Sequence, residues 1–386
     1  MCVGRDPGRH RNTAGETQCI FARRYSRASQ KRCAVPLKGF PTHTRRGFLL
    51  PRSPPVIAKL AYDRNHSRKS GAVMKKLSFL VSLTNNENDY QQEQAAAAEK
   101  AARRLGVDLE IVYADNDAVL QSQQLLHFIQ GAAASRPDAI VFEPAGGTGF
   151  PQVARAAVAA DIGWVILNHE ADYLHDLRQS CQVPVFSISS DHEGIGKIQG
   201  KQFAKLLPEG GSVLYVEGPA NSGAARERTA GMNSTKPANI RVKSIRGNWT
   251  EESAHRAVTS WLRLRTSQET SIDLVAAQDD SMTAGARKAF ADLPAGERER
   301  WLKVPFTGCD GLPKTGQAWV RSGLFAATIY VPPNTDLALE MLTAAIRTGS
   351  QPPELKLTVA QSMPALEEIA GTLAKPVKDV HRAAGV

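Results

Sequence analysis

The chain has 386 residues, of which 42% are hydrophobic and 22% are charged, an ordinary composition for a soluble protein of one or two domains. Residues 1–73 hold 16 Lys and Arg against 3 Asp and Glu, a net charge of +13, whereas the rest of the chain holds 32 against 35, a net charge of −3. No apolar run reaches the ~18 residues of a membrane-spanning helix, and the body has no basic excess that would favour nucleic acid.

Residues 1–73 are rich in Arg, Ser, Pro and Gly and lack helical or strand periodicity, so the sequence predicts a disordered basic extension. They contain no pair of short amphipathic helices for a DNA-binding headpiece. The segment "TRRGFLL" at 44–50 resembles a twin-arginine export signature, but Pro51, Arg52 and Lys59 interrupt the apolar stretch that such a signal needs. We find no convincing signal peptide here and expect Met74 to be the functional start.

From Lys75 onward, β-rich apolar segments alternate with helical ones. The predicted strands are "KLSFLVSL", "LEIVYA", "DAIVFEP" and "GWVILN", and the predicted helices between them are "AAAAEKAARRLG", "AVLQSQQLLHFIQGAA" and "FPQVARAAVAAD". Strands with continuous apolar cores that alternate with helices are typical of a parallel sheet covered on both faces.

The alternation restarts further along the chain. Helices are predicted over Glu193–Leu207, Ala224–Asn233, Glu251–Leu264, Ser281–Asp292, Lys314–Arg321 and Asp336–Arg347. Strands are predicted over Val213–Val216, Ile240–Ile245, Ile272–Ala276, Val304–Thr307, Ala326–Tyr330 and Leu355–Val359. Two doubly wound α/β units account for this number of strands better than one large sheet.

Polar residues recur where the predicted strands end, which is where ligands of doubly wound sheets bind. They are Ser82, Asn85, Asn86, Glu143, Asn168, His169, Asp279, Asp280, Cys309 and Asp310. Any single one could be a helix cap or a turn residue. Together, at the same edge of two sheets, they favour a binding cleft.

Five segments resemble bacterial periplasmic sugar-binding proteins of the ribose-binding type, which are the substrate receptors of ABC importers. They are "SFLVSLTNN", "EGPANSGAARERTAGM", "AAQDDSMTAGARKAF", "FTGCDGLPKTG" and "GLFAATIYVPP". The resemblance runs from Lys75 to about Met363. The same fold serves as the ligand domain of lactose-repressor-type regulators.

The resemblance implies two Rossmann-like α/β lobes, the type I periplasmic-binding-protein fold, that close on a sugar about three hinge crossings. We expect these crossings near Ser189–Asp191, Val331–Pro333 and Leu355–Leu357. The predicted organisation is a basic extension over 1–73, a first lobe over 74–189 plus 332–355, a second lobe over 190–331 plus 356–365, and a tail over 366–386.

The resemblance also assigns roles to individual residues. It implies Asn86 as a partner for sugar hydroxyls, Tyr90 as a stacking ring and Arg228 as the ligand-contacting arginine. Trp249 falls where the second lobe supplies an aromatic, although core packing is an equal alternative for this residue. The predicted ligand-binding set is Asn86, Tyr90, Glu143, Asn168, His169, Arg228, Trp249, Asp279 and Asp310.

Several positions depart from the ribose-binding pattern. Asn168-His169 stands where the pattern has Asp-Arg, and Glu143 stands where it has Asn. Cys309 replaces an aromatic residue, and Val331 replaces a glutamine near a hinge. One arginine is missing and a carboxylate is added, so the cleft is more acidic. This would suit a polyol, a sugar other than ribose, or a ligand that carries an amine.

The main prediction is therefore a non-catalytic receptor for a sugar or polyol, monomeric, with an importer permease as protein partner and without nucleic acid, cofactor or metal. The alternative is a cytoplasmic sugar sensor or regulator with the same fold. An enzyme is not expected, because "GGTGFPQ" and "GIGKIQG" lack the spacing of dinucleotide-binding loops. The resemblance places the protein in the periplasm or cell envelope, and the missing signal peptide keeps a cytoplasmic location open.

Overall fold

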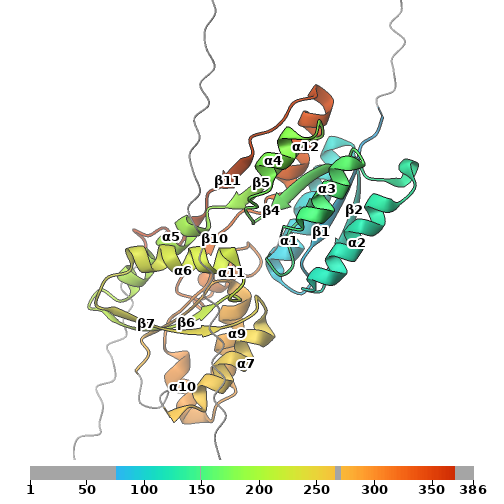
Figure 1. The fold of residues 1–386 in the computed structure, drawn as a ribbon. Helices are drawn as coiled ribbons and strands as arrows, with labels where there is room; N and C mark the ends of the chain where they lie inside the picture. Colours follow the sequence, from blue (N-terminus) through green and yellow to red (C-terminus); the bar gives the residue numbers. More distant parts are fainter. Residues whose placement is uncertain (1–74, 148, 266–270, 370–386) are drawn as a thin grey trace, which may run out of the picture. The chain divides into compact units, whose positions relative to one another are not determined.

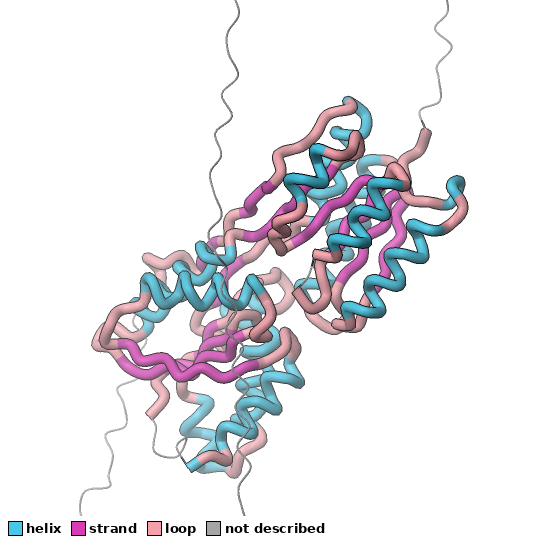
Figure 2. The backbone as a smooth tube through the Cα atoms, viewed as in Figure 1, coloured by secondary structure: helices cyan, strands magenta, loops and turns pink. Residues whose placement is uncertain are grey.

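A computed structural model describes residues 75–147, 149–265 and 271–369 (Figure 1). The prediction of a basic extension over 1–73, and of a functional start at Met74, lies outside the described residues. Within the described ranges, strands and helices alternate along the chain and form two parallel sheets with helices on both faces (Figure 2). This confirms the predicted α/β class of two doubly wound lobes.

The first sheet has six parallel strands in the order β11-β5-β4-β3-β1-β2. Their bounds are β1 (Ser78–Leu83), β2 (Asp108–Tyr113), β3 (Ala139–Phe142), β4 (Gly163–Leu167), β5 (Val185–Ser190) and β11 (Leu355–Thr358). Side chains alternate between the two faces of β1: Phe79 and Val81 pack towards α1 (Asp89–Leu105) and α12 (Thr335–Thr348). Leu80 faces the opposite core, which contains α2 (Ala118–Gln130), α3 (Pro151–Ala159) and α4 (Leu174–Gln179).

The second sheet has four parallel strands in the order β7-β6-β8-β9, namely β7 (Ile240–Arg246), β6 (Gly211–Glu217), β8 (Leu274–Ala277) and β9 (Phe306–Thr307). One face packs on α5 (His192–Leu206) and α6 (Gly223–Thr235), and the other on α7 (Glu251–Leu262), α9 (Asp280–Ala291) and α10 (Ala295–Leu302). The antiparallel pair β10 (Thr328–Tyr330) and β12 (Gln361–Met363) and the short helices η1 (Ala133–Ser135) and α11 (Gly316–Arg321) complete these elements.

The chain passes between the two sheets after β5, after β10 and after β11. The third crossing was predicted too early. Leu355–Thr358 pairs with Ser187–Ser190 in the first sheet, so residues 356–358 belong to the first lobe and not the second. The tail also starts later than predicted, because Leu366 and Ile369 pack in the core of the second lobe. The other lobe boundaries stay a prediction.

Sequence reasoning did not find α4, β5, α10, β12 or the short helix η1. In β5, the sequence "VFSISS" looks half polar, yet all six residues are buried. Two of its serine hydroxyls are satisfied by the segment that follows β4: Ser187 Oγ donates to the carbonyl oxygen of His169, and Ser190 Oγ donates to Asn168 Oδ1. Buried serines that are satisfied in this way remove the apolar signal of a central strand.

Helices α5 and α6 pack against each other unusually closely. A Cβ at Gly196 would lie 2.0 Å from the carbonyl oxygen of Arg228, and one at Gly231 would lie 2.1 Å from that of Glu193. Only glycine allows two helix backbones to come this near. This contact fixes the part of α6 that carries Arg228. Among the described helices, none is long and apolar enough to cross a membrane.

Candidate ligand-binding pocket

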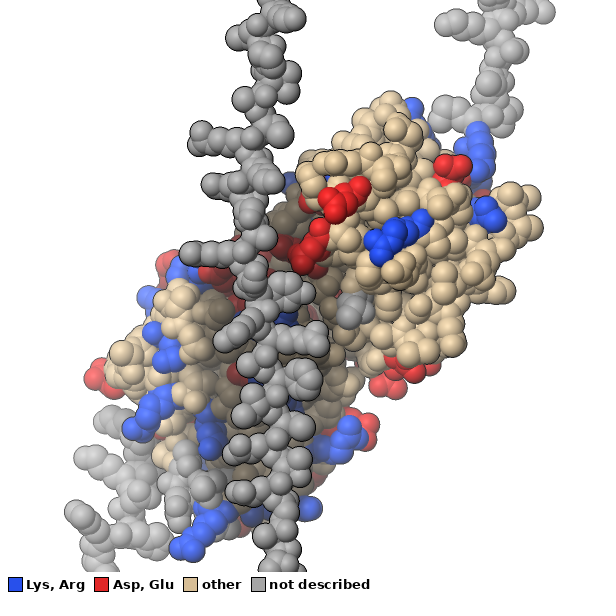
Figure 3. Space-filling model, viewed as in Figure 1, with Lys and Arg blue, Asp and Glu red and all other residues tan. Residues whose placement is uncertain are grey.

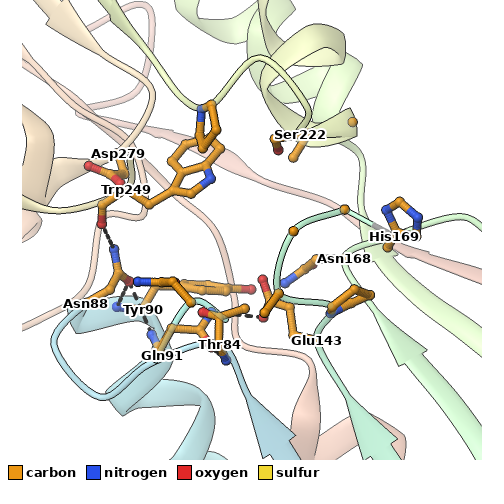
Figure 4. A pocket seen from close by; sticks show the side chains of 18 of the residues that line it. Thr84, Asn88, Tyr90, Gln91, Glu143, Asn168, His169, Ser222, Trp249 and Asp279 are labelled. Atoms are coloured by element: carbon orange, nitrogen blue, oxygen red, sulfur yellow. Dashed lines mark hydrogen bonds between the residues drawn. The ribbon is translucent and has the colours of Figure 1, made fainter. Parts of the chain in front are cut away.

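A cavity of about 210 Å³ lies between the carboxyl ends of the two sheets (Figure 4). This is below the ~300–1,000 Å³ of pockets for drug-sized ligands, so a small ligand is favoured over an oligosaccharide. Its lining comes from the segments that follow each of the strands β1 to β9. Both lobes therefore contribute, as expected for doubly wound sheets.

Two aromatic rings, one from each lobe, line the pocket. Tyr90 lies in the first turn of α1, and its hydroxyl donates a 3.2 Å hydrogen bond to the carbonyl oxygen of Pro332. Trp249 lies in the loop between β7 and α7 and has a left-handed φ of 61°. Figure 4 shows both rings bordering the same space. Rings of this kind can pack on the apolar C–H faces of a sugar or cyclitol.

The left-handed backbone at Trp249 is unfavourable for a bulky residue, by roughly 1–2 kcal/mol. Two contacts hold it: Asn88 Nδ2 donates a 2.8 Å hydrogen bond to the carbonyl oxygen of Trp249, and the Arg228 guanidinium lies 5.6 Å from the indole centroid. Asn168 and Asp310, also in the pocket, have positive φ as well. Strained backbone of this kind gathers at ligand sites because it aims side chains at the ligand.

The first lobe contributes a carboxylate among amides. Gln91 Nε2 donates a 2.9 Å hydrogen bond to Glu143 Oε2. Asn168 Oδ1 accepts hydrogen bonds from the backbone N–H of Ser190 at 3.3 Å and from Asn334 Nδ2 at 2.9 Å. Burial raises the pKa of Glu143, and the side-chain amides of Gln91 and Asn168 oppose that rise.

In the second lobe, Arg228 is buried and anchored by Gln278. Arg228 Nη1 donates to the carbonyl oxygen of Gln278, whose side chain accepts from the backbone N–H of Gly218 and donates to the carbonyl oxygen of Ala225. Gln278 is fully buried. It fixes the ends of β6 and β8 relative to α6, and Arg228 with them.

The second lobe has three buried carboxyl groups in or beside the pocket, those of Asp279, Asp280 and Asp310. Asp279 caps α9 through Oδ1, which accepts from the backbone N–H of Met282. Asp280 points away from the pocket, and its two oxygens accept 2.7 Å hydrogen bonds from the Gly311 N–H and the Thr328 hydroxyl. Asp280 thereby holds the loop that carries Asp310. Burial raises the pKa of Asp279 to about 7 and that of Asp280 to about 8.

Two histidines reach the pocket wall. His192, the first residue of α5, is 5% exposed, and neither of its ring nitrogens has a hydrogen-bond partner within the protein. Burial, followed by the charge of Arg228, lowers the pKa of His192 to about 3. Burial also lowers the pKa of His169, with a smaller contribution from Arg226. Both imidazoles are therefore neutral at pH 7 and can each donate and accept one hydrogen bond.

The pocket brings together the predicted site residues of both lobes, with one exception. Tyr90, Glu143, Asn168, His169, Arg228, Trp249, Asp279 and Asp310 all line it. Asn86 is exposed and does not line this pocket, so its role as a hydroxyl partner stays a prediction. Its neighbours Asn85 and Asn88 line the pocket instead. The segment "TNNEN" offers three asparagines, and only the start of α1 decides which of them face inward.

The most informative residue that sequence reasoning missed is His192. It follows the strand β5, which was not recognised, so its place beyond a strand end was not apparent. Asn116, Ser190, Asn221 and Ser222 were missed too. Cys309 does not line the pocket: it packs with Tyr90, Ile195 and Leu312 in a small apolar cluster.

Replacing Gly218 with alanine is expected to weaken ligand binding about fivefold while leaving the fold intact. An added Cβ would lie 2.2 Å from Cζ2 of Trp249, so the ring must move away from its place in the pocket. Loss of one aromatic packing contact is worth about 1 kcal/mol. Isothermal titration calorimetry of a bound sugar would measure it. Gly296→Ala, which has nothing within 4 Å of the added Cβ, is the matched control. Unchanged affinity in Gly218→Ala would show that Trp249 does not contact the ligand.

Comparisons with known proteins agree with this architecture. The ribose import binding protein of Salmonella typhimurium is 25% identical over 299 residues, which covers 76% of this chain and 94% of that protein. A "Putative rhizopine-binding protein" of Rhizobium meliloti is 28% identical over 191 residues, and the match spans 48% of this chain and 58% of the length of that relative.

Solved structures share the fold. A periplasmic solute-binding protein of Actinobacillus succinogenes with bound D-allose has a TM-score of 0.64 at 21% identity, covering 76% of this chain and 99% of that chain. Caulobacter myo-inositol binding protein, bound to myo-inositol, has a TM-score of 0.60 at 19% identity over 74% of this chain and 92% of that one. The periplasmic binding protein domain family matches residues 79–350. The chain with its two parallel-sheet lobes belongs to the periplasmic binding protein domain family.

Proposed function

We propose that this protein binds a single-ring sugar or polyol reversibly in the pocket between its lobes and delivers it, unchanged, to an ABC importer. The observation that carries the proposal is the pocket itself. Aromatic rings from the two lobes border it, and carboxylates and amides from the strand ends, with the Arg228 guanidinium from α6, surround it. Rings for the C–H faces and polar groups for the hydroxyls are what recognition of a sugar requires.

The relatives support the importer role. Among them are a ribose import binding protein, a D-apiose import binding protein and a D-allose-binding periplasmic protein. Their names favour the importer receptor over the cytoplasmic regulator, and they support a location in the periplasm. On the face drawn in Figure 3, Lys and Arg side chains are scattered among other residues, which agrees with a small-molecule partner and not with nucleic acid.

The chemistry of the groups in and beside the pocket supports binding without turnover. Burial raises the pKa of the Cys309 thiol, with Asp310 adding to the rise while Arg228 opposes it, so a thiolate nucleophile is disfavoured at neutral pH. The ring nitrogens of His192 contact no nucleophile or carboxylate. A general base in an acid–base pair would be held by such a partner.

A thermal-shift screen of monosaccharides and cyclitols, followed by calorimetry of those that bind, tests the proposal. A ligand at 100 times its Kd stabilises the folded protein by about 2.7 kcal/mol and should raise the melting temperature measurably. We expect one ligand per chain and quantitative recovery of that ligand. A panel in which no compound shifts the melting temperature, or in which the bound compound is chemically converted, would contradict the proposal.

A further inference from the structure

The pocket has an excess of acidic groups. Glu143 from the first lobe and Asp279 and Asp310 from the second line it, and Arg228 is the one cationic side chain among its described lining residues. The two lining histidines, His169 and His192, have lowered pKa values and stay neutral. When its carboxyl groups are ionised, the lining therefore carries two more negative charges than positive ones.

The carboxyl groups of Asp279 and Asp310 are buried, and too few positive charges lie near them to balance their ionised forms. Burial raises the pKa of Asp310 well above its ordinary range, and the neighbouring charge of Asp279 adds to this while Arg228 opposes it. The titratable groups that act on Asp279 and Asp310 from the surrounding elements are Asp89 and Tyr90 of α1, Arg228 of α6, Asp280 of α9 and Cys309 before Asp310. Of these, Arg228 alone is cationic.

An independent observation is the set of buried polar atoms without partners. Asp279 is 2% exposed, and its Oδ2 has no hydrogen-bond donor within the protein, although Oδ1 is satisfied by the α9 backbone. At the same pocket His192 leaves both ring nitrogens unpartnered, and Arg228 leaves its Nε–H donor unpartnered, which a ligand hydroxyl can accept. A buried carboxylate oxygen without a donor costs about 1–3 kcal/mol or more, so a ligand that supplies the donor is strongly favoured.

We infer that the ligand is an amino-substituted single-ring polyol, and that its ammonium group binds at Asp279 in a pocket that Glu143 and Asp310 also line. This rests on the proposed function and names the ligand class of the same pocket. An ammonium group supplies the two things that the site lacks: a hydrogen-bond donor for Asp279 Oδ2 and a positive charge. The remaining hydroxyls of the ring are left for the amides, the neutral histidines and Arg228.

Proton release is a second consequence. The buried carboxyl groups are partly protonated in the free protein, because their pKa values are raised, and a bound ammonium favours their ionised form. The amino ligand should therefore bind with net release of protons near neutral pH. Its affinity should rise from pH 6 to pH 7.5, as Asp279 ionises. A neutral polyol lacks the charge that would drive this release.

The test is calorimetry of the full chain with matched sets of compounds. Each set holds a monosaccharide or cyclitol, its amino-substituted form and the N-acetylated form of that amine, for example D-glucose, D-glucosamine and N-acetyl-D-glucosamine. We expect the tightest binder of the panel to be an amine, at least about tenfold tighter than its neutral and acetylated counterparts. Repeating the titration in two buffers of different ionisation enthalpy should show proton release.

Asp279→Asn preserves the cap of α9 and removes the charge, and it should reduce the ratio of amine to neutral affinity at least about fivefold. Glu143→Gln should reduce it in the same direction, and circular dichroism checks that both variants fold. If a neutral compound is the tightest binder, or Asp279→Asn leaves the ratio unchanged, the inference fails while the proposed function stands. If nothing in the panel binds, the proposed function fails, and this inference with it.

Discussion

Replacing Arg228 with alanine is expected to abolish measurable ligand binding and to lower the free energy of unfolding by about 3 kcal/mol at pH 8. Arg228 is 7% exposed and is the cation that faces Asp279 and Asp310. Removing one partner of a buried charged network leaves the others uncompensated, which costs about 3–5 kcal/mol when they cannot neutralise. At lower pH the two aspartates can take up protons, so the loss of stability should be smaller there.

Chemical denaturation and calorimetry of the same variant measure the two effects. Arg226→Ala is the matched control, because Arg226 lies on the same helix but is exposed. It should change the free energy of unfolding by less than about 0.5 kcal/mol. An Arg228→Ala protein with unchanged affinity and stability would place this guanidinium outside both the site and the charged network.

The ligand-free protein is expected to lose stability as the pH rises from about 4 to about 8. In the folded state, burial raises the pKa of Asp279 to about 7 and that of Asp280 to about 8, above the ~3.8 of an unfolded aspartate. A carboxyl with a raised pKa binds its proton more tightly when folded. Its stabilising contribution is therefore complete below pH ~4 and is lost as the pH rises through the folded pKa.

Asp280→Asn isolates part of this effect. An asparagine can still accept from the Gly311 N–H and can donate to the Thr328 hydroxyl, so the loop that carries Asp310 keeps its two anchors. The free energy of unfolding of the variant should depend less on pH between pH 6 and 9. At pH 8.5 it should exceed that of the wild type by about 1 kcal/mol or more. Denaturation curves at several pH values measure it. An equal slope in both proteins would mean that Asp280 is ionised throughout.

The sequence was sufficient to predict the two lobes and most of the pocket, because one physical rule links the two. Parallel strands buried on both faces are recognisable as apolar runs, and the residues that follow them must gather at one edge of each sheet. Glu143, Asn168, Asp279 and Asp310 were located in this way. Arg228 lies on a helix and not at a strand end, so only the family resemblance indicated it.

The errors arise where the local signal is ambiguous. His192 was missed because the buried serines of β5 concealed the strand before it. Asn88, whose side chain caps α1 and contacts the second lobe, was overlooked beside Asn86. The edge strand β11 has three exposed residues and one half-buried residue, so its hydrophobic pattern does not indicate which of the two sheets it joins. Pairing with β5 decides that, and pairing is a tertiary property.

Native mass spectrometry of the protein after incubation with a mixed panel of sugars, cyclitols and their amino derivatives tests the central claim most directly. The account predicts a single complex of one ligand per chain that Arg228→Ala does not form. The ligand released from that complex should have the mass of a compound that was added. A complex that forms equally well in Arg228→Ala, or a released compound of altered mass, would contradict reversible binding in this pocket.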